Sequence, residues 1–318
     1  MKEKGRPMQT TVVVVPRERF SLMERCIEQI YAHTPEPFGL IVVDANSPRN
    51  IALRMKQLAA RHPNCRVVRS AKFLYPYEAK NMALPHIQTE WVAFVDSDVM
   101  VGPNWLTHLL TAAHETGVRI VHPLYLVEQA GEIRIHMTDG RIKWVERNGQ
   151  KRMQLVMGHV AQDVSQARGL SRQESDFVEF HTFMIRRDLL QQMGPFEKAN
   201  LAEDVAYSLR LREKKEKIIF EPKSVITYVA GPPFERYDLP YFRFRWNLEV
   251  ARQSADELGR RFPLTEEYVK SKFSWVTYHH SRVAPWFTLR RRLRRWADKV
   301  PSRLTGMARR FVPSLKES

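Results

Sequence analysis

Two carboxylates, Asp96 and Asp98, follow a short apolar run, with Ser97 between them. The run at residues 91–95 is typical of a buried strand in a parallel sheet. Alternate side chains of a strand point the same way, so both carboxylates can lie on one side. Because Mg²⁺ and Mn²⁺ prefer oxygen ligands, the segment predicts a divalent metal site. The alternative is a polar turn, in which Asp and Ser are common.

A second acidic pair, Glu203 and Asp204, begins a segment with apolar residues at helical spacing. A carboxylate can act as a general base and take a proton from a reacting hydroxyl group. The structural alternative is that acidic residues in the first turn of a helix are stabilised by the helix dipole.

The elements that must position these residues alternate along the first half of the chain. Apolar runs predict strands at residues 10–15, 40–43, 66–69 and 91–96. Helical spacing predicts helices at residues 50–60, 78–84 and 105–114, and another after Ser21, which has capping-box spacing to Glu24. This alternation indicates parallel βαβ units and an α/β fold.

The second half of the chain has a looser pattern. It predicts strands at residues 120–127, 178–185, 218–220 and 225–229, and helices at residues 188–193 and 203–214. Residues 131–149 indicate a hairpin or an insertion, and residues 162–176 a polar surface loop. From Pro232 onward the chain is rich in aromatic and basic residues and less regular.

Four of these segments stand in an order that is typical of one family. They are Val15-Pro16-Arg17, Val43-Asp44-Ala45-Asn46-Ser47, Asp96-Ser97-Asp98 and Leu201-Ala202-Glu203-Asp204. Over residues 10–229 the chain therefore resembles the family 2 glycosyltransferases. The resemblance implies a single Rossmann-like nucleotide-diphospho-sugar transferase domain of the glycosyltransferase A (GT-A) type. Such a domain has a central, mostly parallel sheet, and we expect a helical, basic C-terminal extension after it.

The resemblance implies a nucleotide diphosphate sugar as donor, with a UDP-sugar favoured by family habit. Asp44 would accept a hydrogen bond from the base, and Pro16 and Arg17 would lie near the nucleotide. Family members often have a basic residue and Asn before the metal strand, which are Lys80 and Asn81 here. Lys80 would add positive charge beside the phosphates. A solvated helix face is the alternative interpretation of this pair.

The resemblance also assigns the acidic residues. Asp96 would contact the ribose or the metal, Asp98 would bind the metal, and Ser97 would belong to the donor site. The cofactor would be Mn²⁺ or Mg²⁺, stabilising negative charge on the leaving diphosphate. Asp204 would be the general base, and Glu203 would orient the acceptor or stabilise its loop.

The expected reaction is a single sugar transfer, with inversion, to a hydroxyl group on a glycan or a lipid-linked acceptor. Attack opposite the departing diphosphate inverts the anomeric centre. Processive relatives carry Gln-x-x-Arg-Trp, whereas this chain has Phe242 in place of the Gln before Arg245 and Trp246. The absence of predicted transmembrane helices also speaks against polymerisation.

The third metal ligand has several candidates in this sequence. Many relatives carry a His after the strand that follows the Glu-Asp helix, but residues 225–229 here contain none. His181, His279 and His280 are candidate substitutes. The alternative is that diphosphate oxygens and water complete the coordination, as is usual for Mg²⁺.

The composition of the chain argues against a membrane-spanning protein, a signal peptide and a disulfide-rich fold. Hydrophobic residues make up 43% of the 318 residues, which is enough for a substantial core. No apolar run approaches the ~20 residues that span a bilayer, and residues 1–9 lack the apolar segment of a signal peptide. The 2 cysteines indicate neither a disulfide framework nor a metal site. We therefore expect a cytoplasmic location.

The net charge of +16 is concentrated at the carboxyl end, where residues 286–318 contain ten Lys or Arg and two Asp or Glu. Apolar residues at helical spacing are interrupted by five arginines over residues 286–296, which is typical of an interfacial helix on an anionic membrane. This predicts peripheral binding to the inner membrane face. A helix packed on the catalytic domain is the main alternative, and nucleic acid binding is disfavoured because no nucleic-acid module accompanies the charge.

Three parts of the chain are expected: a catalytic domain at 8–230, an aromatic and basic acceptor-side extension at 231–285, and a basic amphipathic tail at 286–318. Two other functions are considered. One is a catalytically silent, nucleotide-sugar-binding scaffold on a membrane. The other is a nucleotidyltransferase of related fold, although Pro16-Arg17-Glu18-Arg19 lacks the Gly-rich loop of such enzymes.

Overall fold

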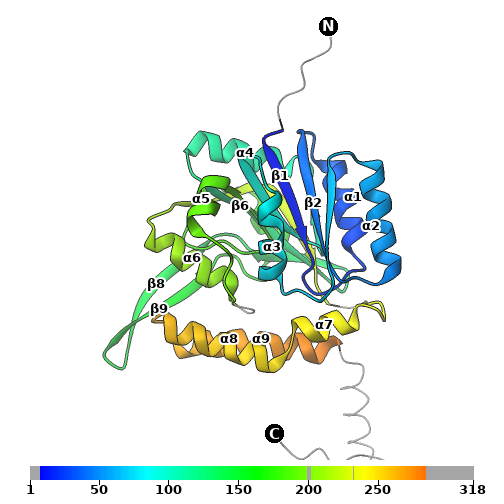
Figure 1. Ribbon diagram of the computed structural model, residues 1–318. Coiled ribbons are helices and arrows are strands. Elements are labelled where there is room, and N and C mark those ends of the chain that lie inside the picture. Colours follow the sequence, from blue (N-terminus) through cyan, green and yellow to red (C-terminus); the bar gives the residue numbers. More distant parts are fainter. Residues whose placement is uncertain (1–7, 199–201, 232, 284–318) are drawn as a thin grey trace, which may run out of the picture.

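A computed structural model describes residues 8–198, 202–231 and 233–283 of the chain. In these residues the main sheet has ten strands, with the order β10-β12-β6-β11-β4-β1-β2-β3, and β5 and β7 pair with β12 and β6. Helices pack against this sheet (Figure 1), and the arrangement confirms the predicted α/β class.

The first half of the chain follows the predicted alternation. The elements are β1 (Thr10–Val15), α1 (Met23–His33), β2 (Phe38–Ala45), α2 (Arg49–Arg61), β3 (Cys65–Ser70), α3 (Pro76–Ala83), β4 (Trp91–Asp96), β5 (Val99–Val101) and α4 (Trp105–Thr116). Strands β3, β2, β1 and β4 are parallel neighbours. β1 and β4 are buried along their whole length, which explains their continuous apolar runs.

The second half contains more strands than the sequence predicted. The elements are β6 (Ile120–Gln129), β7 (Glu132–Met137), β8 (Gly140–Arg147), β9 (Gln150–Met157), β10 (Gln173–Ser175), β11 (Thr182–Arg186), α5 (Arg187–Met193), α6 (Glu203–Glu213) and β12 (Ile218–Val229). Residues 131–149, predicted as a hairpin or an insertion, hold β7, which pairs with β6, and β8, which pairs with β9 in a separate two-stranded sheet.

Several boundaries differ from the predictions. Residues 162–176 are not only a loop, because β10 pairs with the start of β12. The two strands predicted over residues 218–229 are one strand, whose register shifts between Glu221 and Val225. The strand predicted from Val178 begins at Thr182. The predicted Ser21 capping box is wrong, since α1 has no side-chain cap and the Ser21 N–H instead bonds to Asp238.

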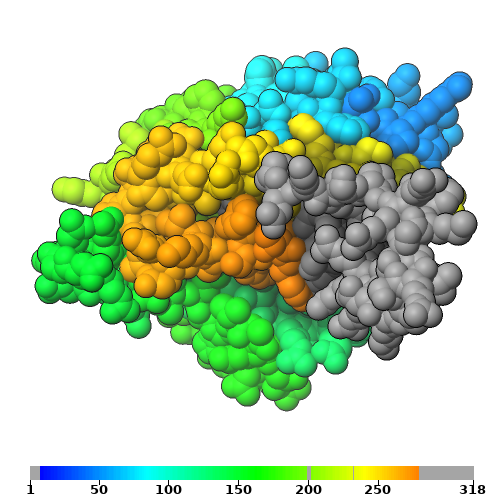
Figure 2. Space-filling view, turned by 90° about the horizontal axis from the view of Figure 1, so that it is seen from below, coloured from blue at the N-terminus to red at the C-terminus, as the bar shows by residue number. Residues whose placement is uncertain are grey.

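The region after Pro232 was expected to be less regular but contains three helices: α7 (Leu239–Arg245), α8 (Leu248–Arg261) and α9 (Glu266–Val283). They lie below the sheet, at the end where β1 finishes (Figure 1). In the view from below, the yellow and orange residues of the C-terminal helices cross the molecule beside green residues from the middle of the chain (Figure 2). Helices from the C-terminal part of the chain therefore cover the edge of the sheet at which the parallel strands end.

Buried polar groups join this extension to the loop after β1. The buried carboxylate of Asp238 accepts hydrogen bonds from the backbone N–H groups of Phe20 and Ser21, at 2.8 and 3.1 Å. The indole of Trp246 donates to Glu18 Oε2 at 3.0 Å. Because these groups are buried and paired, the extension and the first βα loop form one packed unit.

The basic tail at 286–318 lies outside the described residues. Among the helices of the described ranges, none combines the length and the apolar character that crossing a bilayer requires.

Candidate active site

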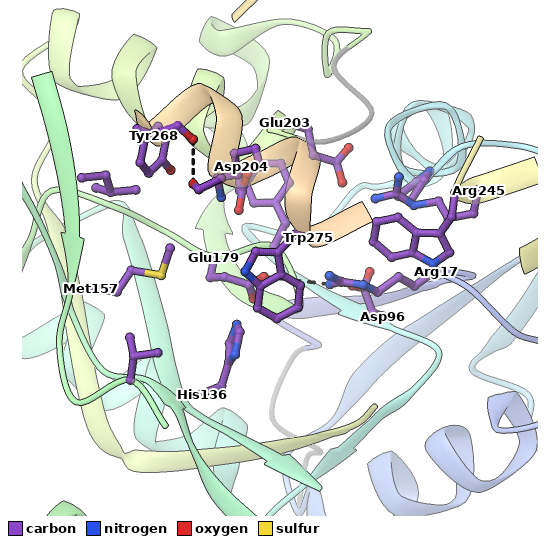
Figure 3. Close-up of a pocket in the computed structure, with 17 residues that line it drawn as sticks. Arg17, Asp96, His136, Met157, Glu179, Glu203, Asp204, Arg245, Tyr268 and Trp275 are labelled. Carbon is purple, nitrogen blue, oxygen red and sulfur yellow. Dashed lines mark hydrogen bonds and ion pairs between the residues drawn. The ribbon is translucent and has the colours of Figure 1, made fainter. Parts of the chain in front are cut away.

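A cleft of about 390 Å³ lies between the carboxyl edge of the main sheet and helix α9. Its walls combine charged groups from the sheet edge with apolar and aromatic groups from β9 and α9 (Figure 3). The lining residues are Arg17, Pro76, Asp96, His136, Leu155, Met157, Val160, Glu179, Phe180, Glu203, Asp204, Arg245, Trp246, Tyr268, Ser271, Lys272 and Trp275.

A group of two carboxylates and one imidazole lies at the sheet edge beside the cleft. Asp96, Asp98 and His181 each offer a ligand atom, and these atoms lie within 4.8 Å of one another. Asp96 ends β4, and His181 comes just before β11, which runs antiparallel to β4. The backbone N–H of Asp96 donates to the carbonyl of His181 at 2.9 Å, so the pairing of these strands brings the two residues together.

This group has the chemistry of a cation site. Asp96 Oδ1 and Asp98 Oδ1 are both buried and have no hydrogen-bond partner in the described residues. Burial raises the pKa of Asp98 to about 7, although the nearby Arg17 opposes this shift. Unpaired carboxylate oxygens are costly when they are buried, and a bound cation would remove that cost. The residues therefore fit a divalent metal ion.

Arg17 is the cation closest to this group. Its Nη1 donates to Asp96 Oδ2 at 2.9 Å and also contacts His181 Nδ1. The neighbouring carboxylates of Asp96 and Glu179 hold the pKa of Arg17 above its usual value, despite the opposing effect of burial. Arg17 thus balances part of the negative charge at the sheet edge.

The segment at residues 225–229, which lacks the His that the family resemblance led us to expect, carries Tyr228. Tyr228 lies near the end of β12, and its ring stacks on His181 at 4.0 Å and 15°. His181 therefore reaches the carboxylates from the turn before β11, and the Tyr228 ring packs against it from β12. The side chains of His279 and His280 lie outside the part that the structure describes.

Glu203 and Lys80 form a buried ion pair at the start of α6. Lys80 is fully buried, and its Nζ lies 3.2 Å from Glu203 Oε1. Its ammonium also lies 4.9 Å from the ring centre of Phe180. Burial raises the pKa of Glu203, and Lys80 opposes the shift. A solvated helix face is therefore wrong for Lys80, which points into the protein.

Asp204 lines the cleft beside Glu203, in the first turn of α6. Its Oδ1 accepts a hydrogen bond from the Val205 N–H at 2.8 Å, which fixes the side chain at the helix N-terminus. Two residues of α9, Tyr268 and Lys272, line the same cleft. The acid thus lies where a molecule in the cleft could contact it (Figure 3).

Asp44 lies outside this cleft and is buried at the end of β2. Its Oδ1 accepts from the Ser47 N–H at 2.7 Å, and its Oδ2 forms an ion pair with Arg69. Arg69 stands opposite Asp44 in the β2–β3 register. The Asp44 carboxylate is therefore already bound by Ser47 and Arg69, at the end of β2 where the resemblance predicts the nucleotide base.

The other residues predicted for the nucleotide-sugar site make hydrogen bonds that involve backbone groups. The Pro16 carbonyl accepts from the Tyr241 hydroxyl at 3.1 Å, and Ser97 Oγ donates to the Arg19 carbonyl at 3.2 Å. The Asn81 amide exchanges two hydrogen bonds with the Phe196 backbone, at 2.7 and 2.8 Å. These bonds shape the loops around the cleft.

Some residues of the cleft were not predicted from the sequence. Glu179 is buried, and burial raises its pKa to about 8 while Arg17 opposes the shift. His136 on β7, Glu179 and His181 form a second group with ligand atoms within 4.8 Å. The nearness in sequence of Glu179 and His181, two potential ligands just before the apolar run of β11, was the signal that could have identified the pair.

Arg245 and Trp246 also line the cleft, so the Arg-Trp dipeptide of the sequence lies at the site. Arg245 is buried, its guanidinium lies 4.6 Å from the Trp246 ring centre, and burial lowers its pKa while nearby Glu203 opposes the shift. A buried cation and an aromatic wall are thus added to the acidic groups.

Comparison with solved structures identifies the fold. GalNAc-T7, solved with UDP, GalNAc and Mn²⁺, is 14% identical with a TM-score of 0.56, and the match covers 88% of this chain and 56% of that chain. TarS 1–349 of S. aureus, solved with UDP-GlcNAc, is 17% identical with a TM-score of 0.52, covering 93% and 77%. The mannosyltransferase PcManGT from Pyrobaculum calidifontis, solved with GDP-Man and Mn²⁺, is 18% identical with a TM-score of 0.52, covering 98% and 84%.

This chain spans just over half the length of GalNAc-T7. At such low sequence identities, the three comparisons establish a shared fold and nothing more. No curated protein matches the chain. The family model described as Glycosyl transferase family 2 matches residues 11–193, which is more than half of the chain and includes the predicted metal strand. Because the family model covers more than half of the chain, the chain belongs to glycosyl transferase family 2, and its solved neighbours share its fold.

Proposed function

We propose that this enzyme is an inverting, divalent-metal-dependent glycosyltransferase that moves one sugar from a nucleotide diphosphate sugar to a hydroxyl group. One observation carries the proposal. Asp96, which belongs to the Asp96–Asp98–His181 group, lines the same cleft as the Glu203–Asp204 pair, although these residues come from distant segments. A charge-stabilising site beside a candidate base is what such a transfer requires.

The donor we propose is a UDP-sugar. Two of the three structural neighbours were solved with UDP or UDP-GlcNAc and one with GDP-Man, which supports a nucleotide sugar in this fold. We assign the base to the loop after β2, beside Asp44, and the diphosphate to the sheet edge near Asp96. Arg17 and Lys80 are cations that contact the carboxylates along this path, and Arg245 lines the cleft on the same side as Arg17 (Figure 3). Pro16, Ser97 and Asn81 hold the loops of the donor site.

The proposed metal is Mn²⁺ or Mg²⁺, held by Asp96, Asp98 and His181. The unpaired buried oxygens of the two aspartates support this choice. When bound, the ion would stabilise the negative charge that grows on the leaving diphosphate.

Asp204 is the proposed general base. The acceptor oxygen would attack the anomeric carbon as the bond to the diphosphate breaks, and its proton would pass to Asp204. Attack from the side opposite the leaving group inverts the anomeric centre. Glu203 is tied to Lys80, so we assign it to orienting the start of α6 rather than to proton transfer.

We propose that residues 8–230 bind the donor and that the extension at 231–285 forms the acceptor side. Trp246, Tyr268 and Trp275 from this extension line the cleft and support the division. A glycan or a lipid-linked acceptor fits such aromatic walls, because both carry apolar surfaces. Peripheral binding to the inner membrane face through the basic tail completes the proposal.

The direct test is sugar transfer from UDP-sugars in the presence of Mn²⁺ or Mg²⁺, using water as the fallback acceptor. We expect Asp204→Asn to lower kcat by roughly 10²–10⁴, the usual contribution of a general base. Asp98→Asn should raise the metal concentration that gives half-maximal rate. Asp188→Asn is the matched control, because Asp188 pairs with Arg186 at α5 and does not line the cleft. Wild-type transfer by Asp98→Asn or Asp204→Asn would remove the role given to that residue.

A catalytically silent scaffold is the second candidate, and calorimetry distinguishes it. A scaffold would bind UDP-sugar with Mn²⁺ while no free UDP accumulates over time. Release of pyrophosphate from a nucleoside triphosphate would instead indicate a nucleotidyltransferase.

A further inference from the structure

The structure assigns to Glu179 a role beyond the proposed reaction: we infer that it is a positioning residue, which holds His181 so that Nδ1 faces the two aspartates. The inference rests on the metal dependence proposed above. Metal-binding His residues commonly donate their second ring N–H to a carboxylate, which fixes the ring and its tautomer. Here Glu179 is the carboxylate at the second nitrogen.

The contact with Arg17 identifies which nitrogen of His181 carries the lone pair. Arg17 Nη1 contacts His181 Nδ1, and a guanidinium can only donate hydrogen bonds. Nδ1 must therefore be the acceptor, so the proton of the neutral ring lies on Nε2. Nε2 lies 3.4 Å from Glu179 Oε1, while Nδ1 lies 3.3 Å from Asp96 Oδ2. The ring thus presents its lone pair to the aspartates and its N–H to Glu179.

Glu179 also holds the backbone of the same residue. Its Oε2 accepts a hydrogen bond from the His181 N–H at 2.9 Å. One carboxylate therefore contacts both the main chain and the ring of His181. Because Glu179 is only 6% exposed, water competes little for these contacts.

Two aromatic groups restrict the ring further. Tyr228 stacks on it at 4.0 Å, and the His136 ring lies edge-on at 5.6 Å and 81°. His181 itself is 1% exposed. A ring held by stacking, an edge contact and a carboxylate keeps one orientation, which is what a metal ligand needs.

A different placement of the ion would use His136, Glu179 and His181, which also form a group within 4.8 Å. In that case Glu179 would be a ligand and Asp98 would not. We favour the aspartate side because its two buried oxygens have no partner, whereas Glu179 Oε2 is occupied by the backbone N–H of His181.

Arg17 now stands between two of the proposed ligands. Its Nη1 lies 2.9 Å from Asp96 Oδ2 and contacts His181 Nδ1. A cation that used both atoms would replace this nitrogen, and the released guanidinium would remain close enough to meet an anionic group of the donor.

The test measures Mn²⁺ binding to the full chain with UDP present, by the electron paramagnetic resonance (EPR) signal of free Mn²⁺. We expect Glu179→Ala to weaken Mn²⁺ binding by about 10- to 100-fold, the usual effect of removing such a partner. Glu179→Gln should weaken it less, because the amide oxygen can accept from one of the two N–H groups of His181 that face this side chain. Pulsed EPR of bound Mn²⁺ should show coupling to a ring nitrogen in the wild type, and His181→Ala should abolish it.

Three further variants make the result decisive. Glu221→Gln is the matched control, since Glu221 is also a buried glutamate but pairs with Arg172 seven residues before Tyr228 on β12. It should leave Mn²⁺ binding unchanged. Asp98→Asn should weaken binding far more than His136→Gln, which removes only the edge contact to the His181 ring. The reverse result for these last two variants would place the ion in the other group and overturn the inference.

Wild-type Mn²⁺ affinity in both Glu179 variants would also overturn it, while leaving sugar transfer as a separate question. Conversely, a wild type that binds Mn²⁺ with the expected dependence on Glu179 but transfers no sugar would keep the inference and remove the proposed reaction. The two failures are therefore distinguishable.

Discussion

At the scale of single residues, the site depends on charged groups that are buried with a specific partner. Lys80 has no exposed surface and pairs with Glu203 at the start of α6. Breaking a buried ion pair leaves one charge without compensation, which costs more than the pair itself contributes. The residue predicted to lie beside the phosphates therefore also supports the fold.

Replacing Lys80 by Met should lower the free energy of unfolding by about 3 kcal/mol, because Glu203 would lose its ion-pair partner in a buried position. Urea denaturation measures the change. The double variant Lys80→Met/Glu203→Gln should recover much of the loss, since both charges are then removed. A Lys80→Met protein as stable as the wild type would contradict the structural role of the pair.

His122 gives the fold a pH dependence that is separate from the cleft. Burial lowers its pKa from 6.5 to about 4, and its Nδ1 donates to the Pro123 carbonyl at 3.1 Å. The unfolded chain takes up this proton below pH 6.5, whereas the folded chain does so only near pH 4. Stability from this group is thus complete above pH 6.5 and is lost as the pH falls.

The expected loss between these two pH values is about 3 kcal/mol, from the size of the pKa difference. Urea denaturation at several pH values measures it. The variant His122→Phe, which keeps a ring beside Tyr125 and Phe220, should show a weaker pH dependence. The same change at the exposed His114 should leave the wild-type dependence intact, and an unchanged slope in His122→Phe would contradict the assignment.

At the scale of elements, the C-terminal helices are fixed to the first βα loop and cannot be treated as an appendage. Asp238, just before α7, accepts from the backbone N–H groups of Phe20, Ser21 and Glu235. The hydroxyl of Tyr241 on α7 contacts the carbonyl groups of Pro16 and Leu74, which lie on two different loops. The helices that close the cleft thus also hold the loop that carries Arg17.

Asp238→Ala should lower the free energy of unfolding by about 3 kcal/mol, because it leaves several backbone donors, some of them buried, without acceptors. The variant should also bind UDP more weakly, since the loop after β1 loses its anchor. Asp163→Ala is a control for the loss of a carboxylate cap, because exposed Asp163 caps only the short turn at Val164–Ala167. A fully stable Asp238→Ala protein would contradict this account of the extension.

At the scale of the whole molecule, charge is distributed unevenly between residues 1–285 and the tail. The chain carries +16 overall, and the tail at residues 286–318 holds ten Lys or Arg against two Asp or Glu. A basic segment of this kind is attracted to acidic surfaces, and the attraction weakens as salt screens it.

Deleting residues 286–318 should therefore reduce binding to vesicles that contain anionic lipid, and wild-type binding should fall as salt is added. Vesicle sedimentation measures both. Neutral vesicles provide the control for binding that does not depend on charge. If the shortened chain bound anionic vesicles as well as the full chain, the membrane proposal for the tail would be lost.

The sequence by itself determined the local elements and the chemistry at their ends. The apolar runs of β1, β2 and β4 could be read directly, because buried parallel strands need continuous apolar residues. The carboxylates at 96, 98 and 204 could be identified as candidates from the order of their motifs along the chain, because a polar turn or a helix N-terminus can explain each of them taken alone.

Only the tertiary structure decided which of these groups meet. His181 reaches Asp96 because β11 runs antiparallel to β4, and Arg69 meets Asp44 because of the β2–β3 register. The burial of Lys80 and the closure of the cleft by the C-terminal helices likewise depend on contacts between distant segments. Lys80 and Glu203, for example, are more than 100 residues apart in the sequence. Hydrophobic periodicity reports the environment along one segment, but the direction and register of neighbouring strands come from packing between segments, which no local pattern contains.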